Sequence, residues 1–466
     1  MTQRLLPAAL VAACAALVYG QSKVPAVTGG EVDNQLIFGR NVDSPPILSQ
    51  RMLRARQSLR GLSSAESVIR PDASVADDKA FVTTPGFPNE PTNIGPIENI
   101  ELNGGQSINF DGQDPVVAHA VRISTQHPRV RSSRIVAWRG IGVQLVVPPA
   151  VFNSSSAKIE SNVIQGCYTG IAVSSDQEVL GNTILACRDY GLVAPNPAGN
   201  VTIANNHFYG CNGRDERGEY DGKCVYMPNG SGWRLVGNTM ADSHYGFVSG
   251  GGGSHTSTIS ACTFFKNSKC AIQINGGATN FRIDGCTISV PPGTDHEQFR
   301  DITGVELAGN RNSVSDSVLF LDGVNVSGLP GTPNAGRSTA LRVSGQANTC
   351  VNTVFLDYGC PAGKARGIHI PTAVRGFRAD VQMWGFEDPG DVFLDIDLPT
   401  IEGVHIVIHG NSVDSSAASN KVRAFTPRDV AQYVDIPAGW DGKKNSITLI
   451  DEATNTTVKA AGGKAY

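Results

Sequence analysis

Three residues with side chains suited to proton transfer recur at one position of a repeated pattern: Glu306, Arg342 and His369. Each is flanked on both sides by aliphatic residues, as in a short strand. Glu306 or His369 could take or give a proton, and Arg342 could neutralise the carboxylate or sulfate of an acidic sugar. If the segments lie side by side, these residues form one exposed catalytic file. They could equally be solvated strand residues whose opposite charges pair across strands.

The equivalent residue can be identified in eight such segments. In chain order these residues are Ala172, Val193, Tyr226, Val248, Gln273, Glu306, Arg342 and His369. The file is therefore apolar at its beginning and polar at its end. We predict that Tyr226 and Gln273 bind substrate, with the Tyr226 ring offering a surface on which a sugar can stack.

Long insertions precede some of these segments and should form loops along one side of the file. They are Cys211 to Cys224, Ser289 to Thr303 and Asp322 to Thr339. The second carries Asp295 and Asp301, further catalytic candidates because glycoside hydrolysis requires paired carboxylates. We assign His244, His296 and Arg300 to substrate binding. Binding residues commonly lie on loops that a rigid scaffold positions.

The first insertion is acidic and is bracketed by two cysteines. Its carboxylates, those of Asp215, Glu216, Glu219 and Asp221, could hold Ca²⁺ or could form a solvated acidic loop. Cys211 and Cys224 could close the loop with a disulfide or remain free. Other cysteines, such as Cys167 and Cys187, recur at one repeat position and are predicted to be buried thiols. No cofactor is predicted with certainty, and no cysteine–histidine cluster indicates zinc.

The elements that position these residues repeat along the chain. The mark is Asn, Cys or Asp, then any residue, then an apolar one, and its first residues are Asn162, Asn182, Asn206, Asn238, Cys262, Cys286, Asp316 and Asn352. The intervals run from 20 to 36 residues, which is too short for helical crossovers between parallel strands. A minimum period with variable insertions predicts a solenoid. Stacked coils of two or three strands would align the marks as internal ladders.

With these repeats, the sequence resembles the right-handed parallel β-helix proteins of the pectin-lyase-like superfamily, over about residues 97–412. The resemblance implies an all-β solenoid with a binding groove along one face. It implies no single activity, because the superfamily contains lyases, hydrolases, epimerases and non-catalytic surface proteins. Catalytic residues cannot be transferred by motif. The Asp pair of polygalacturonases is matched only by Asp77-Asp78, which precedes the repeats, and Asp295-His296-Glu297 lacks the proline of alginate epimerases.

Two classes of function agree with this reading. The first is a secreted polysaccharide lyase or glycoside hydrolase that acts on an acidic glycan in the groove. The second is a non-catalytic adhesion or glycan-binding protein of the cell surface, or a tailspike-like viral receptor-binding protein, for which a homotrimer is the expected assembly. An enzyme would lose turnover on one substitution, whereas a binding face would lose affinity in small steps.

The flanks of the repeats differ in character. Residues 1–20 resemble a signal peptide, with a lipoprotein at Cys14 as an alternative, which places the protein outside the cell or at its surface. Residues 21–96 read as a linker or cap that contains a basic amphipathic helix from Ile47 to Leu62. Residues 413–466 read as a terminal cap or oligomerisation segment with strands at Tyr433 to Ile436 and Ser446 to Leu449.

Composition supports an all-β chain and excludes some partners. The 466 residues include 52 glycines and 5 methionines, which argues against long helices. With 38 basic and 42 acidic residues, the net charge is −4, without the basic excess of a nucleic-acid-binding protein. Beyond the N-terminus, no segment is apolar enough to predict a membrane span.

Overall fold

The computed structural model describes residues 157–213 and 219–386 without a break. It also describes 94–105, 119–125 and 127–146, and shorter stretches between 31 and 88 and between 391 and 465. The predicted signal peptide, including Cys14, lies outside the described residues. None of the helices in the described part of the chain is long and apolar enough to cross a membrane.

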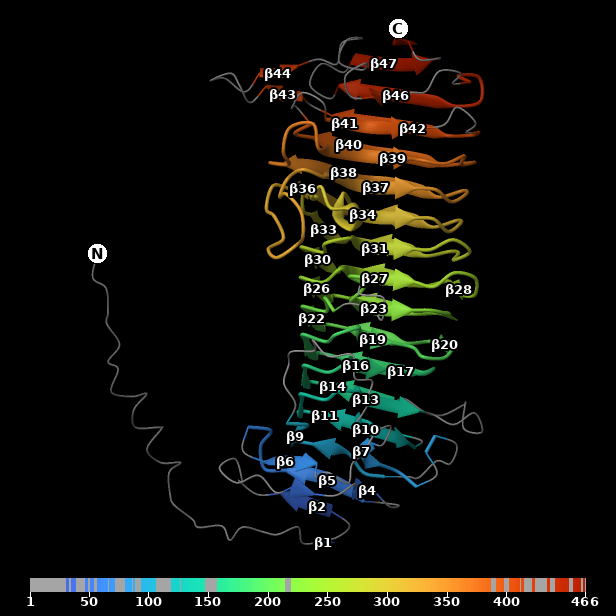
Figure 1. Ribbon diagram of the computed structural model, residues 1–466. Helices are drawn as coiled ribbons and strands as arrows, with labels where there is room; N and C mark the ends of the chain where they lie inside the picture. The colour runs from blue at the N-terminus through green and yellow to red at the C-terminus, as the bar shows by residue number, and fades with distance from the viewer. Residues whose placement is uncertain are drawn as a thin grey trace, which may run out of the picture.

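One face of the molecule is a 14-stranded parallel sheet, here called the front sheet (Figure 1). Its strands stack in chain order, one from each coil of the chain. They are β4 (Arg51–Met52), β7 (Ala80–Thr83), β10 (His119–Ser124), β13 (Ile141–Val146), β16 (Thr169–Ala172), β19 (Tyr190–Val193), β23 (Lys223–Met227), β27 (Tyr245–Ser249), β31 (Cys270–Ile274), β34 (Asp301–Leu307), β37 (Arg337–Val343), β39 (Ala365–Ile370), β41 (Val392–Ile396) and β45 (Val434–Asp435).

The rest of each coil forms two columns of short strands, here called the back columns. The first comprises β2 (Gln35–Phe38), β5 (Ser58–Gly61), β8 (Ile97–Glu98), β11 (Arg129–Arg131), β14 (Ala157–Glu160), β17 (Gln177–Leu180), β21 (Thr202–Ala204), β25 (Arg234–Val236), β29 (Thr258–Ser260), β32 (Arg282–Asp284) and β35 (Ser313–Ser315). The second comprises β3 (Ile47–Leu48), β6 (Val68–Pro71), β9 (Glu101–Asn103), β12 (Arg134–Val136), β15 (Val163–Gln165), β18 (Thr183–Leu185), β22 (His207–Tyr209), β26 (Thr239–Ala241), β30 (Thr263–Phe265), β33 (Thr287–Val290) and β36 (Val318–Asp322). Both continue into single longer strands, β38 (Thr349–Tyr358), β40 (Arg378–Trp384), β42 (His405–Gly410) and β46 (Ser446–Asp451).

Parallel pairing from coil to coil makes the chain a parallel β-helix, which confirms the predicted all-β solenoid. The interior is filled by apolar residues that stack at equal positions of the second back column. This ladder runs through Ile135, Ile164, Ile184, Phe208, Met240, Phe264, Ile288, Leu319, Phe355 and Met383, all of them buried. Each coil covers the apolar side chains of the next, so no single coil could bury its own.

A buried asparagine ladder lies at the turn between the two back columns. The Asn182 side chain donates hydrogen bonds to the Ile159 carbonyl at 2.8 Å and to the Asn206 side chain at 2.9 Å. Its oxygen accepts from the backbone N–H of Asn162 at 2.9 Å. These bonds satisfy polar groups that the turn would otherwise leave unpaired inside the protein.

At two coils, the predicted ladder residue lies one position before the residue that is in the ladder. Asp316 and Asn352 are exposed turn residues with φ of 50° and 49°, and the buried ladder passes instead through Ser317 and Thr353. The Ser317 hydroxyl accepts the Cys286 N–H at 3.1 Å, as an asparagine oxygen does in earlier coils. Asp and Asn tolerate left-handed backbone at turns, which explains why they occur one position earlier here.

The predicted basic helix from Ile47 to Leu62 is also wrong. The described part of that segment consists of strands: β3, β4 and β5. Leu59 is buried, and the guanidinium of Arg60 binds the carboxylate of Glu98 on the next coil. The segment spans strands of different sheets, so pairing with neighbouring coils determines its conformation rather than local helical spacing. The parallel pairing that stacks one coil on the next therefore begins before residue 97.

The C-terminal end closes with antiparallel strands. β46 pairs in parallel with β42 and then antiparallel with β47 (Thr456–Ala461), which pairs with β48 (Lys464–Ala465). A separate antiparallel pair joins β43 (Ser412–Asp414) to β44 (Lys421–Arg423), and at the other end β1 (Glu31–Val32) pairs antiparallel with β2. The division of the chain at 20, 96 and 412 stays a prediction.

Nine cysteines of the described residues are free and buried, Cys211 and Cys224 among them. Of the two alternatives for that pair, the structure has the free thiols. The Cys224 thiol lies 3.0 Å from the Ser243 hydroxyl. Cys167 and Cys187 are buried at successive coils, as predicted from their repeat position.

Candidate functional site

The predicted file exists as one line of paired residues on the front sheet. Strand pairing aligns Ala172, Val193, Tyr226, Val248, Gln273, Glu306, Arg342 and His369 in this order. The next strand extends the file to Asp395. Neighbouring strands lie about 4.8 Å apart, so the polar part from Gln273 to Asp395 extends over about 19 Å. We call this line the front file.

Two of the insertions contact each other across the coils between them. The Tyr220 ring packs edge-on against Phe299 of the second insertion, with centroids 5.1 Å apart. The Tyr220 N–H also lies 3.4 Å from the Gln298 side-chain oxygen. Phe299 ends the short 3-10 helix η2 (Glu297–Phe299) and is fully buried. The first two insertions therefore meet on the side where the front strands begin.

The first polar group in the front file joins Gln273, Glu306 and Arg342. The Gln273 amide donates to one carboxylate oxygen of Glu306 at 2.9 Å, and the Nε of Arg342 lies 3.8 Å from the other. The Glu306 side chain is 19% exposed and that of Arg342 is 40% exposed. The 3.8 Å contact is longer than a hydrogen bond, so the guanidinium can turn towards a bound anion without breaking one.

The second polar group surrounds His369. Arg366 donates to the His369 Nδ1 at 2.9 Å, and Nε2 of His369 lies 3.0 Å from an Asp397 oxygen. Arg366 also forms a 3.0 Å ion pair with Asp395. Burial, followed by the charge of Arg366, lowers the pKa of His369 below its ordinary value. Because an arginine can only donate, Nδ1 accepts and Nε2 carries the proton, so the imidazole is neutral.

Three atoms of the second group lie close enough together to bind a metal ion. One atom each from His369, Asp395 and Asp397 falls within 4.8 Å of the others. Arg366 already neutralises Asp395 and occupies His369 Nδ1, so the group as it stands is an ion-pair network. The predicted Ca²⁺ loop is only partly described. Asp215 and Glu216 lie outside the described residues, and Asp221 forms a 2.5 Å ion pair with Lys223.

The sequence analysis did not identify Arg366, Asp395 or Asp397. Asp395 is the residue of the front file one coil beyond His369, and the same aliphatic flanks that marked Glu306 would have found it. Arg366 is the second residue of β39 and is only 6% exposed, and a buried arginine carries no sequence signal of its own.

Of the loop residues proposed for the site, Asp301 lies near the second group, where its charge opposes the lowering of the pKa of Arg366 by burial. Both Asp295 oxygens are held at 2.7 Å by Thr332, which lowers the pKa of that exposed carboxyl. His296 accepts the Gln298 N–H and so caps η2. Asp301 and Arg300 are exposed at the start of β34. Their roles in catalysis and binding stay predictions, with Asp295 already engaged between two loops.

His244 is buried beneath residues of the first two insertions. Its Nδ1 lies 2.7 Å from the Ser268 hydroxyl and its Nε2 lies 3.0 Å from the Asn212 carbonyl. A carbonyl only accepts, so Nε2 carries the proton and Ser268 donates to Nδ1. Burial lowers the pKa of His244 to about 4. The His244 side chain is 4% exposed, and Tyr220 and Phe299 pack against its ring. His244 therefore stabilises the contact of the first insertion with the coils.

A cluster that the sequence analysis recognised only at Tyr226 lies lower on the front sheet. It consists of Tyr190, Lys223, Tyr226 and Tyr245, from three successive strands, and we call it the tyrosine–lysine cluster. The Lys223 ammonium is 5.4 Å from the ring centroids of Tyr190 and Tyr226 and 5.6 Å from that of Tyr245. The rings of Tyr190 and Tyr226 stack with centroids 5.4 Å apart. Beside them, burial raises the pKa of Asp189 to about 6.

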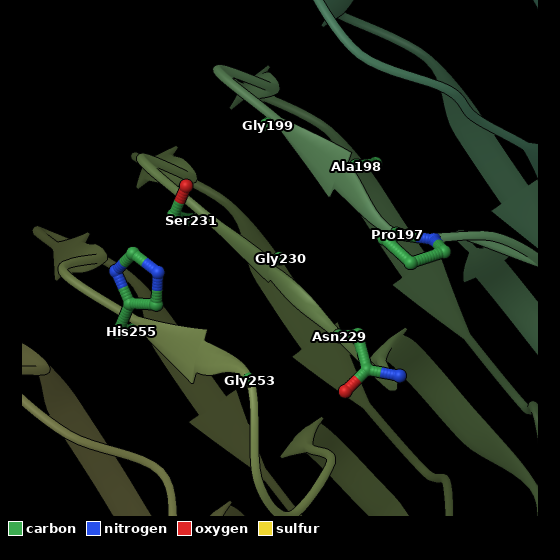
Figure 2. Close-up of a pocket in the computed structure, with 8 residues that line it drawn as sticks. All are labelled: Pro197, Ala198, Gly199, Asn229, Gly230, Ser231, Gly253 and His255. Carbon is green, nitrogen blue, oxygen red and sulfur yellow. The ribbon is translucent and has the colours of Figure 1, made fainter.

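A hollow of about 440 Å³ lies away from the front file. Figure 2 shows that its lining comes from three neighbouring coils, where β20 (Ala198–Gly199), β24 (Gly230–Ser231) and β28 (Ser254–His255) form a small sheet. Three of its eight lining residues are glycines, and His255 is the one titratable residue among the eight. The hollow therefore lacks the carboxylate and the arginine that the front file has.

Residues 150–319 match the model of a family described as a right-handed β-helix region. No curated protein matches the chain in sequence. Solved structures with a similar backbone include the Dettilon tailspike protein, with 13% identity over 80% of this chain and 61% of that one and a TM-score of 0.44. Others are the catalytic domain of a GH87 α-1,3-glucanase, with 11% identity over 82% and 61% and a TM-score of 0.43, and an N-terminal fragment of gene product 12 of bacteriophage Phi29, with 13% identity over 81% and 72% and a TM-score of 0.43. The chain spans about three fifths of the first two.

Proposed function

We propose that this parallel β-helix acts on a polysaccharide along the exposed face of the front sheet. We propose further that it is a secreted lyase or glycoside hydrolase for an acidic glycan. The observation that carries the proposal is the contact of Glu306 with both Gln273 and Arg342, in the file that continues to His369. An acid, a mobile cation and a neutral imidazole then lie on one face.

As a lyase, the site would work by β-elimination. The guanidinium of Arg342 would neutralise the uronate carboxylate, which acidifies the neighbouring C–H. Glu306 would take that proton, since the one basic nitrogen of His369 already accepts from Arg366, the C–O bond to the leaving sugar would break, and the leaving oxygen would receive a proton. As a hydrolase, the same Glu306 would protonate the glycosidic oxygen, and a second carboxylate would activate water or the anomeric carbon.

The test is a degradation screen of the purified chain on acidic and neutral polysaccharides. A lyase product carries an ultraviolet-absorbing unsaturated end, whereas a hydrolase product carries only a new reducing end. On a substrate that the wild type degrades, Glu306→Gln should reduce turnover by about 10²-fold or more at an unchanged melting temperature. Glu178→Gln is the matched control, because Glu178 is paired with Lys158 on the back of the coil. Full activity of Glu306→Gln would move the reaction to the loop that carries Asp295 and Asp301.

A second candidate is a non-catalytic glycan-binding or tailspike-like surface protein. The observation that favours it is the mutual neutralisation of the front-file charges, Glu306 by Arg342 and Asp395 by Arg366. In that case substitutions in the file would lower affinity in small steps and no glycan would be cleaved. The predicted homotrimer belongs to this candidate, and light scattering of the purified chain tests it.

A further inference from the structure

The tyrosine–lysine cluster is a partly exposed group of side chains on the front sheet. Tyr190 and Lys223 open neighbouring strands and are paired in register, and Lys223 is paired in the same way with Tyr245 on the following strand. The ammonium of Lys223 is only about 5.5 Å from each of three rings, a distance at which a cation is attracted to an aromatic face. Lys223 therefore holds the rings in place, with its own side chain 9% exposed.

The cation that the three rings share is already neutralised, and a second lysine, Lys269, lies 5.6 Å from the centroid of the Tyr245 ring alone. The Lys223 ammonium donates to an Asp221 carboxylate oxygen at 2.5 Å and to the Asp221 carbonyl at 2.9 Å. Asp189 adds a second carboxyl close to the same ammonium. What remains for a ligand is the partly exposed Tyr190 and Tyr226, which offer ring surface and hydroxyl groups. An aromatic face packs well against the C–H face of an uncharged sugar ring.

The position of the cluster along the front file gives its distance from the first polar group, which contains Glu306 and Arg342. Tyr226 and Glu306 belong to the same front file, with Val248 and Gln273 between them. Three coil spacings of about 4.8 Å separate them by about 14 Å. A pyranose unit in an extended glycan is about as long as one coil spacing, so a chain along the file would place about three units over this distance.

We propose that the tyrosine–lysine cluster is a subsite for an uncharged sugar ring, about three units along the glycan from the unit at Glu306. The direction of the glycan along the file rests on the proposed function. The binding of a sugar ring at the cluster rests on the cluster alone. The inference assigns the substrate class: a heteropolysaccharide in which neutral units accompany any acidic one. It assigns Tyr190 and Lys223 to the site beside Tyr226, with Lys223 as a positioning residue.

The test measures binding by calorimetry with four series of neutral oligosaccharides, the malto-, cello-, laminari- and xylo-oligosaccharides. At least one series should bind the wild type, and Tyr226→Ala should weaken that binding by about tenfold. Tyr226→Phe retains the ring and should stay close to the wild type. Tyr209→Ala is the matched control, because Tyr209 is 52% exposed on a back column and should not affect binding. A melting curve of each variant verifies the fold.

Two further measurements separate this inference from the proposed function. Glu306→Gln should still bind the neutral series, since it leaves the rings intact, while losing turnover. Oligomers of polygalacturonate are acidic and are expected to occupy only the end of the file at Arg342. They should therefore bind Tyr226→Ala as tightly as they bind the wild type. The subsite is overturned if none of the four neutral series binds, or if Tyr226→Ala and Tyr209→Ala bind alike. Loss of neutral binding in Glu306→Gln would overturn the separation of the two sites.

Discussion

Arg366 donates a hydrogen bond to Nδ1 of His369 at 2.9 Å, and this contact fixes the tautomer of the imidazole. The proton is thereby placed on Nε2, which faces Asp397 at 3.0 Å. Arg366 is itself paired with Asp395, so a buried ion pair sets the chemistry of the histidine. His369 is accordingly a neutral group whose affinity for a proton depends on Arg366.

The first prediction concerns the pKa of His369. Because burial and Arg366 lower it, Arg366→Gln should raise the pKa of His369 towards or above its ordinary value, with Asp395 and Asp397 left to favour the charged imidazole. A proton NMR titration of the imidazole signals measures this without a substrate. The signal of the exposed His255 serves as the internal reference. An unchanged His369 titration in the variant would show that the arginine does not act on the ring.

The second prediction concerns the asparagine ladder. Asn182→Leu should lower the free energy of unfolding by about 1–3 kcal/mol, because it removes the buried bonds to the Ile159 carbonyl and to Asn162. Denaturant unfolding measures the change. Asn212→Leu is the control, since the Asn212 side chain is exposed, and it should cost less than about 0.5 kcal/mol. Equal losses in the two variants would contradict a special role for the ladder.

The fold and the front file could be predicted because both depend on repetition. A coil spacing and a two-residue side-chain period align equivalent residues wherever they occur in the sequence, so Tyr226, Glu306 and His369 fall into one line. Contacts between coils have no such regularity. The burial of Lys223 and the contact of Arg366 with His369 depend on which neighbouring side chains are long enough to meet. Such contacts are a property of the folded surface and are not visible in the repeat.

The same distinction explains the errors. The ladder moves from asparagine to Ser317 and Thr353 because a hydroxyl can accept the same backbone N–H, and a pattern based on Asn, Cys and Asp misses the exchange. The arginines and apolar residues of the segment from Ile47 to Leu62 suit an amphipathic helix, but its strands pair with neighbouring coils. Its Arg60 pairs with Glu98, 38 residues away, in a neighbouring strand.

The third prediction concerns acid stability at His244. Burial lowers the folded-state pKa of His244 to about 4 from an ordinary 6.5, so the unfolded chain binds more protons between these values. This contribution to stability is complete above about pH 6.5 and is lost as the pH falls towards 4, by up to about 3 kcal/mol. His244→Gln can replace both hydrogen bonds and should show a flatter dependence over this range. His255→Gln, at an exposed histidine, should follow the wild type, and a wild-type profile for His244→Gln would contradict the assignment.

The fourth prediction has the opposite sign and concerns Asp189. Burial raises the pKa of Asp189 to about 6 from 3.8, so the folded state binds more protons between these values. Stability from this group is therefore complete below about pH 4 and is lost as the pH rises through 6, by up to about 3 kcal/mol. Asp189→Asn should gain stability relative to the wild type at pH 7.5 but not at pH 3.5, measured by denaturant unfolding at both values. Glu297→Gln, a carboxylate on the exposed loop, should show no such difference. If Asp189→Asn instead loses stability at pH 7.5, the attraction of the carboxylate to Lys223 outweighs the cost of its burial, and Asp189 belongs with Asp221 as a partner of that lysine.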